Sequence, residues 1–152
     1  MTTSSTTRTV KTANLGELEV PEENVIRFRE GIPGFESARE FAMVELENIK
    51  PFQYLQSLGA PPIALLVVNP FLFAAAYKFD LSPLQMEELE AERPEDVIVF
   101  AVATIPENPA EATINLMAPV LINPKQRIGK QVVLLEGDYP MRHPLMGGGR
   151  EA

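Results

Sequence analysis

Few side chains in this chain have the types and spacing that catalysis needs. The 152 residues include no cysteine, so cysteine nucleophiles, thiolate metal sites and disulfides are excluded. The one histidine, His143, stands beside Pro144 near the C-terminus, where a docked or solvated side chain is a simpler interpretation than a general base. One histidine also excludes a His-rich zinc site. We therefore expect no metal, no cofactor and no catalytic residue, and a protein that is not an enzyme.

Two glycine-containing strings match phosphate-binding loops only in part. Residues 129–131 (Gly-Lys-Gln) lack the earlier glycine of that motif, because Pro124 stands in its place, and glutamine replaces the required Ser or Thr. Residues 31–34 (Gly-Ile-Pro-Gly) include a proline and indicate a tight turn instead. Acid pairs such as Glu45 and Glu47 arise by chance among 21 Asp and Glu. Nucleotide binding and acid–base catalysis are both disfavoured.

The charge balance favours a basic protein partner over nucleic acid. There are 13 Lys and Arg against 21 Asp and Glu, a formal net charge of −8, which repels phosphate backbones. Six acids crowd into residues 87–96, including Glu87, Glu88 and Glu90. This acidic cluster is either a solvated helix face or an electronegative patch that steers a basic partner and keeps RNA away.

Polar residues near the C-terminus form a second candidate group. Asn123, Lys125, Arg127 and Lys130 follow one another closely, and we expect all four at the surface. The three basic side chains either form a small basic patch or pair with local acids. In an acidic protein we expect the pairing.

The elements that must position these residues are short strands. Fourteen prolines, about 9% of the chain against a usual 5% or so, nearly exclude long helices. Period-two alternation predicts half-buried strands, and apolar runs predict central strands buried on both faces. The alternating segments are 17–20, 26–29, 75–81 and 128–134; the apolar runs are 63–68 and 97–103; further strands are expected within 41–46, 52–57, 112–117 and 119–122.

One helix is predicted over residues 83–91. Ser82 is a good N-cap, Pro83 suits the first helical position, and Gln85 can complete a capping box. The sequence therefore predicts a mainly β, single compact antiparallel β-barrel-like domain of nine to eleven strands with one short helix.

The domain is expected to span residues 8–145, with a flexible leader at 1–7 and a flexible tail at 146–152. No signal peptide is seen, and the longest apolar run, residues 63–77, is interrupted and too short for a membrane span. We expect a cytoplasmic protein that is monomeric on its own.

Seven strings, in order along the chain, resemble the FliW family of bacterial flagellar assembly factors. They are FREGIPGFE (28–36), FQYLQS (52–57), VVNPF (67–71), YKFDL (77–81), NLMAP (115–119), INPKQRIGKQV (122–132) and YPMRHPL (139–145). The resemblance implies a compact, mostly β fold. It also implies binding to two proteins: CsrA, a small RNA-binding dimer that represses flagellin translation, and flagellin itself. Free flagellin would occupy the factor and release CsrA; exported flagellin would leave the factor free to bind CsrA.

Two further sets of binding residues are expected from these strings. Gly31, Ile32, Pro33, Gly34 and Phe35 form the sharpest string, and either contact a partner or form a fixed turn. Phe71 begins the run 71–73 (Phe-Leu-Phe), whose side chains are either exposed anchors or, as we favour, part of the core.

Two alternatives stay open. The first is a chaperone dedicated to flagellin or another exported protein, with no role on CsrA and with an apolar trough that holds a helix. The second is a small β-barrel ligand-binding protein or enzyme, which would need a deep pocket with convergent polar groups.

Overall fold

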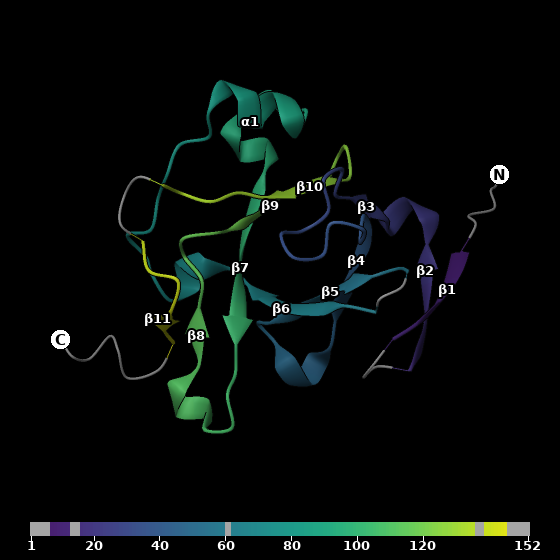
Figure 1. Cartoon of the computed structure of the whole chain (residues 1–152), viewed down its shortest axis with the longest axis horizontal. Coiled ribbons are helices and arrows are strands. Elements are labelled where there is room, and N and C mark those ends of the chain that lie inside the picture. The colour runs from purple at the N-terminus through teal and green to yellow at the C-terminus, as the bar shows by residue number, and fades with distance from the viewer. Residues whose placement is uncertain (1–6, 13–15, 60–61, 136–138, 146–152) are drawn as a thin grey trace.

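The computed structural model describes residues 7–12, 16–59, 62–135 and 139–145 (Figure 1). Within them, eleven strands are joined by short loops. The strands are β1 (Thr7–Lys11), β2 (Glu17–Pro21), β3 (Ile26–Arg27), β4 (Glu40–Glu45), β5 (Gln53–Ser57), β6 (Ala64–Val68), β7 (Ile98–Thr104), β8 (Thr113–Ile114), β9 (Val120–Asn123), β10 (Ile128–Gln131) and β11 (His143–Pro144). The helical elements of the described residues are α1 (Pro83–Glu88) and the 3₁₀ turns η1 (Glu22–Asn24), η2 (Glu47–Ile49), η3 (Pro70–Leu72), η4 (Pro94–Asp96) and η5 (Pro109–Glu111).

Seven of these strands close into a barrel. The hydrogen-bonded order is β7-β6-β5-β4-β3-β10-β9, and β9 pairs back onto β7. This confirms the mainly β, barrel-like domain with one short helix. Antiparallel pairing was expected throughout, but β10 and β3 run parallel and share a single registered pair, Ile128 with Arg27. The barrel is therefore closed by a very short seam between these two strands.

The other four strands flank the barrel. β8 pairs with β7 and β11 with β8, while β1 and β2 form a separate hairpin, seen at the right of Figure 1. Arg8 of the hairpin bonds Glu22 at 2.5 Å and Glu40 of β4 at 2.7 Å, which ties the hairpin to the barrel. β1 begins at Thr7, a residue that we had placed in the leader. The rest of that leader and the tail at 146–152 lie outside the described residues.

Apolar side chains from most of the barrel strands meet inside it. Phe28, Phe41, Leu55, Val67 and Val120 are all almost completely buried in one cluster. The rings of Phe28 and Phe41 meet edge to face, with centroids 5.0 Å apart, a favoured aromatic geometry.

A second apolar cluster lies under α1, which covers β9 and β10 at the top of Figure 1. Its buried residues include Leu89 from the end of the helix, Leu121 of β9 and Ile128 of β10. This cluster fixes the helix against the closing seam of the barrel.

The helix begins as its sequence predicts and ends early. The Ser82 hydroxyl accepts from the Gln85 N–H at 3.1 Å, and the Gln85 side chain accepts from the Ser82 N–H at 3.0 Å. Glu90 adopts a left-handed conformation with φ 53°. The N–H groups of Glu90 and Ala91 then donate to the carbonyls of Glu87 and Met86, which is the Schellman ending of a helix. The expected helix over 83–91 is therefore α1 over 83–88.

The strand expected at 75–81 is wrong, because the chain there forms turns and loop. The alternating aromatic side chains instead pack around Tyr77, whose ring lies 5.7 Å from Phe71, 5.5 Å from Phe79 and 4.7 Å from Tyr139. The run 97–103 is also not buried on both faces, since Ile98 is exposed. In the described part of the chain, every helix is too short or too polar for a membrane span.

Candidate functional site

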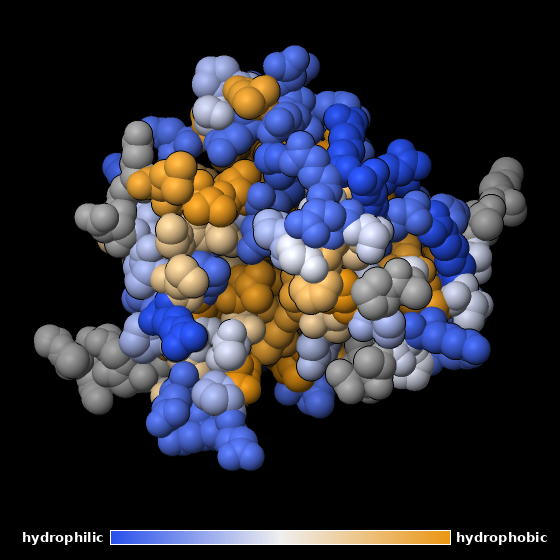
Figure 2. Space-filling view, viewed as in Figure 1, coloured by the Kyte–Doolittle hydropathy of each residue, from blue (hydrophilic) through white to orange (hydrophobic). Residues whose placement is uncertain are grey.

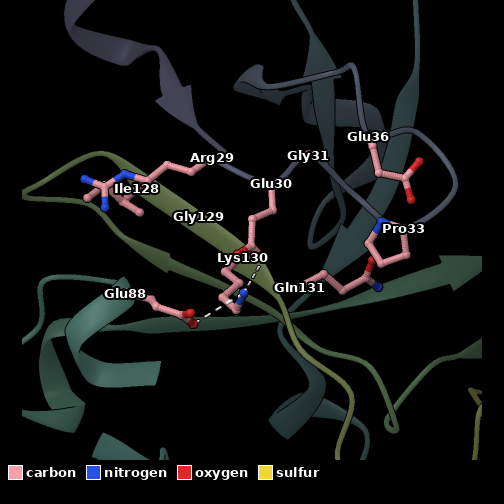
Figure 3. A pocket seen from close by; sticks show the side chains of 10 residues that line it. All are labelled: Arg29, Glu30, Gly31, Pro33, Glu36, Glu88, Ile128, Gly129, Lys130 and Gln131. Atoms are coloured by element: carbon pink, nitrogen blue, oxygen red, sulfur yellow. Dashed lines mark hydrogen bonds and ion pairs between the residues drawn. The ribbon is translucent and has the colours of Figure 1, made fainter. Parts of the chain in front are cut away.

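Three segments with candidate binding residues meet at one pocket of about 450 Å³. We call it the loop–helix pocket, because it lies between the loop at 28–36, the C-terminal end of α1 and β10 (Figure 3). Its lining residues are Arg29, Glu30, Gly31, Pro33, Glu36, Glu88, Ile128, Gly129, Lys130 and Gln131. Of the predicted site residues, Gly31, Pro33, Glu88 and Lys130 are thus brought together.

The loop wall is a rigid turn with an exposed tip. Gly31 has φ +69°, and a Cβ there would stand 2.5 Å from the backbone oxygen of Glu36, so glycine is required. Ile32 is buried in the barrel core, and the Phe35 N–H donates to its carbonyl at 2.6 Å. Pro33, Gly34 and Phe35 are exposed. Gly31 and Ile32 therefore fix the shape of the turn, and Pro33, Gly34 and Phe35 form its exposed tip.

Lys130 links the two walls of the pocket. Its ammonium lies 2.7 Å from the Glu30 carboxylate of the loop and 3.3 Å from the Glu88 carboxylate of α1, as the dashed lines of Figure 3 show. Burial alone would lower the pKa of Lys130, but the two ion pairs outweigh it and raise the pKa above its usual value. The hydrogen bond from Lys130 lowers the pKa of Glu30. Lys130 is thus used internally, as we expected for the basic side chains.

Asn123 fixes the C-terminal end of α1 through hydrogen bonds. We expected it at the surface, and this is wrong: only 2% of the residue is exposed. Its amide nitrogen donates to the carbonyls of Leu89 at 2.8 Å and Glu90 at 3.2 Å, which the helix itself leaves unpaired. Its amide oxygen accepts from the Lys125 N–H at 3.1 Å. The residue is buried because it satisfies two chain segments at once.

Glu90 forms a further link, between the end of α1 and the loop at 28–36. Its carboxylate lies 2.7 Å from the guanidinium of Arg29, so the left-handed residue after the helix is tied to the loop. Three polar links therefore hold together the loop, the end of α1 and the strands β9 and β10: Lys130, Asn123 and the Arg29–Glu90 pair.

Two of the basic candidates lie elsewhere. Lys125 and Arg127 are exposed in the turn between β9 and β10, and neither lines the pocket. Arg127 donates to the backbone oxygen of Glu22 at 2.9 Å. Because Lys130 is enclosed by two carboxylates, these residues do not form one exposed basic patch.

Phe71 also lies apart from the pocket, and our placement of it in the core is wrong. Phe71 is 41% exposed and Leu72 58% exposed, because they occupy the surface turn η3. Phe71 forms the rim of a separate apolar recess of about 140 Å³. We call this recess the aromatic groove; its other lining residues are Lys78, Phe79, Leu81, Pro94, Val97 and Val99.

The acidic cluster divides into two parts. Glu88 and Glu90 are paired with Lys130 and Arg29, and Asp96 accepts from the backbone at the start of η4. Exposed Glu87, Glu92 and Glu95 have no ion pair among the described residues. We call these last three acids the free acidic face; Glu87 precedes Glu88 of the pocket lining in sequence, and Glu95 follows Pro94, which lines the aromatic groove.

Sequence reasoning missed Glu30, Glu36 and Gly129. Glu30 is isolated in sequence, 100 residues before Lys130, so no spacing pattern marks it. Gly129 is required because a Cβ would collide with the ring of Phe28. Gly129 belongs to one of the seven strings that carry the family resemblance (122–132), but that resemblance does not indicate its contact with Phe28.

The chemistry of the pocket is that of a binding surface. It offers paired carboxylates, an amide side chain and backbone groups at the edge of β10. No group of three or more His, Cys, Asp or Glu among the described residues is arranged to hold a metal ion. Hydrogen bonding and ionic contact with another macromolecule are what these groups can provide.

The chain is similar over most of its length to known proteins. The family model described as "FliW protein" matches residues 9–145. A relative named flagellar assembly factor FliW from Caldicellulosiruptor saccharolyticus is 43% identical over 136 residues, covering 90% of this chain and 89% of the relative. A relative of the same name from Bacillus subtilis is 38% identical over 132 residues, covering 87% and 92%.

A solved structure agrees with the fold. The crystal structure of a flagellar assembly factor FliW matches with a TM-score of 0.86 and 33% identity, covering 91% of this chain and 97% of that one. With a family match over residues 9–145 and relatives that align along nearly their whole length, this chain belongs to the FliW family of flagellar assembly factors.

Proposed function

We propose that this chain is a non-enzymatic regulator that binds the translational repressor CsrA and also binds flagellin. Binding CsrA relieves repression of flagellin mRNA, and binding flagellin frees CsrA to repress again. Membership of the FliW family supports this proposal, as does a pocket that offers binding groups. The proposed place of action is the cytoplasm, where flagellin is translated.

The observation that carries the CsrA part is the free acidic face. Glu87, Glu92 and Glu95 are exposed in α1 and the segment that follows it, and have no ion pair among the residues described. An RNA-binding protein presents positive charge to its ligand, so an acidic surface attracts it. Once bound, the same carboxylates oppose the approach of RNA phosphates.

The test is titration calorimetry with CsrA at low and moderate salt, comparing the parent with Glu87→Gln/Glu92→Gln/Glu95→Gln. We expect affinity to fall about tenfold at low salt and by much less at moderate salt, because screening removes what the charges contribute. The matched control is Glu45→Gln/Glu107→Gln/Glu111→Gln, which removes three exposed acids at other places.

Equal loss in the two triple variants would show that only net charge matters and that this face has no special role. An affinity that no variant changes would contradict the electrostatic part. Absence of CsrA binding by the parent would contradict the proposed regulation itself.

The aromatic groove supports a second candidate function, a chaperone dedicated to flagellin. Exposed Phe71 lines this apolar recess, and such a trough suits the apolar face of a helix. Under this function the parent would bind flagellin but not CsrA, and Phe71→Ser would weaken flagellin binding.

A further inference from the structure

β10 leaves one of its edges open beyond the seam. Beyond Gln131 the chain runs beside the segment that precedes β9, because the N–H of Val132 donates to the carbonyl of Pro119 at 3.1 Å and that of Leu134 to the carbonyl of Met117 at 2.7 Å. In an antiparallel pair, the residues between these bonded positions point their backbone groups the opposite way. The N–H and C=O groups of residues 131, 133 and 135 therefore face away from β9.

That side of the strand has little to pair with. β3 meets β10 only at Ile128, and beyond this point the loop at 28–36 diverges. No other described segment makes a backbone hydrogen bond with residues 131, 133 or 135. We call residues 131–135 the open edge.

The open edge is also apolar. Val133 is 49% exposed and Leu135 85% exposed. Figure 2 shows hydrophobic side chains gathered where the chain leaves β10, below and to the left of α1. Free strand edges are normally protected by charge, proline or shortness.

Other free edges of this molecule are protected in that way. β1 carries Arg8 and Lys11, and β11 has two residues, of which one is Pro144. The open edge combines unpaired backbone groups with exposed aliphatic side chains, which is the pattern of a site for strand addition.

The open edge continues into the loop–helix pocket. Gln131 belongs to both, so a chain laid along the edge would enter the pocket at one end. There it would meet Glu36, whose carboxylate accepts a hydrogen bond from the Gly34 N–H and has no ion pair among the described residues. The other charged side chains there are already paired, Lys130 with Glu30 and Glu88 and Arg29 with Glu90, so Glu36 is the carboxylate left to attract a basic residue.

Charge also selects the occupant. A second copy of this chain would bring another formal charge of −8 to the same edge, which opposes association. A basic segment is favoured by the same field.

We propose that the open edge binds an extended segment of a protein partner, which adds as a strand beside residues 131–135. The segment has apolar side chains at alternate positions, facing Val133 and Leu135, and a basic residue at the end that enters the loop–helix pocket. This inference rests on the proposed function in one respect only, namely that the binding partner is a protein.

The main test removes one backbone donor. Val133→Pro deletes the N–H that faces the open side and leaves the bonds of residues 132 and 134 intact. We expect affinity for the partner that uses the edge, CsrA or flagellin, to fall about tenfold or more, since a hydrogen bond and strand geometry are lost together. Val133→Ala, which keeps the N–H, should cost about threefold. Leu72→Ala, an exposed leucine elsewhere, should leave that affinity unchanged, and thermal unfolding checks that each variant is folded.

A second measurement is independent of the variants. Amide hydrogen exchange of the full chain, followed by NMR, should slow at residues 131, 133 and 135 when that partner is added. If Val133→Pro binds CsrA and flagellin like the parent, and exchange at these amides does not slow, the open edge is not the site, while the proposed function stands.

If the parent binds neither protein, the proposed function fails and a synthetic peptide decides the inference. The probe is acetyl-Lys-Val-Lys-Val-Lys-Val-amide at millimolar concentration. Slowed exchange at residues 131, 133 and 135 of the parent, with no slowing at residues 131 and 135 of Val133→Pro, would support strand addition, and no effect on the parent would overturn it. A parent that is dimeric, with a monomeric Val133→Pro, would also overturn it, because the edge would then bind a second copy.

Discussion

The loop–helix pocket and the aromatic groove are stabilised by different kinds of interaction. The pocket is held by Lys130, Asn123 and the Arg29–Glu90 pair, all of which join segments distant in sequence. The groove is held by the packing of rings around buried Tyr77. Polar links are directional and fix a geometry, whereas aromatic packing provides most of the stability. We infer that the groove stabilises the fold and that the pocket positions a surface for binding.

The largest effect expected is at Tyr77, the buried ring against which Phe71 and Phe79 of the groove pack. Tyr77→Ala should lower the free energy of unfolding by about 3–5 kcal/mol, because a buried ring with three aromatic neighbours is lost. Urea unfolding measures this. Tyr77→Phe keeps the ring and loses only the hydrogen bond to the Leu116 carbonyl, 2.7 Å away, so it should cost about 1–2 kcal/mol. Equal losses would mean that the hydrogen bond, and not the packing, is what the groove provides.

The next largest effect is at the base of the pocket. Asn123→Ala leaves the Leu89 and Glu90 carbonyls without their donor, and should cost about 2–3 kcal/mol. The control is Asn69→Ala, which removes one exposed bond to the Phe71 N–H at the start of η3 and should cost about 1 kcal/mol. If both variants melt at the same temperature, Asn123 has no special role in holding the helix end.

A smaller effect, dependent on pH, is expected at the link between the pocket walls. Lys130→Met should cost about 1 kcal/mol at neutral pH, since Glu30 is largely exposed and screened by solvent. The raised pKa of Lys130 means its contribution is present below 10.5 and lost as pH rises through the folded-state pKa. The lowered pKa of Glu30 means its contribution is present above 4.5 and lost as pH falls through the folded-state pKa.

The check is the difference in melting temperature between the parent and Lys130→Met at several pH values. It should be greatest between 4.5 and 10.5 and shrink in stronger acid or base. A difference that does not depend on pH would show that the lysine contributes through its methylene packing and not through the ion pairs.

The smallest effect on stability is expected at the rim of the groove. Phe71→Ser should change the free energy of unfolding by less than about 1 kcal/mol, because the side chain is 41% exposed. CsrA and flagellin should bind it as they bind the parent. A loss of flagellin affinity alone would place flagellin in the groove and contradict the division of roles between the two regions.

Local features of the sequence predicted local structure well. Ser82, Pro83 and Gln85 lie within four residues and specify the helix start without help from the rest of the chain. Strands at β4 and β5 follow from their residue patterns in the same way. The alternation at 75–81 led to a wrong strand prediction, because side chains that pack around one ring can have the same period as a strand.

Features that depend on contacts between residues distant in sequence could not be predicted from local sequence patterns. Asn123 is buried because a helix end 34 residues earlier needs a donor, and nothing near Asn123 indicates this. The early end of α1 depends on the left-handed residue Glu90, at a position where glycine is usual. The closing of the barrel through a parallel seam of one residue pair likewise has no local signal.

The most direct test of the account follows all three macromolecules at once. Fluorescence anisotropy of a labelled flagellin mRNA leader bound to CsrA is measured while the chain, and then flagellin, is added. The account predicts that the chain lowers the anisotropy by releasing the RNA and that flagellin restores it. Anisotropy that the chain leaves unchanged, under conditions where CsrA binds the RNA, would contradict the proposed regulation.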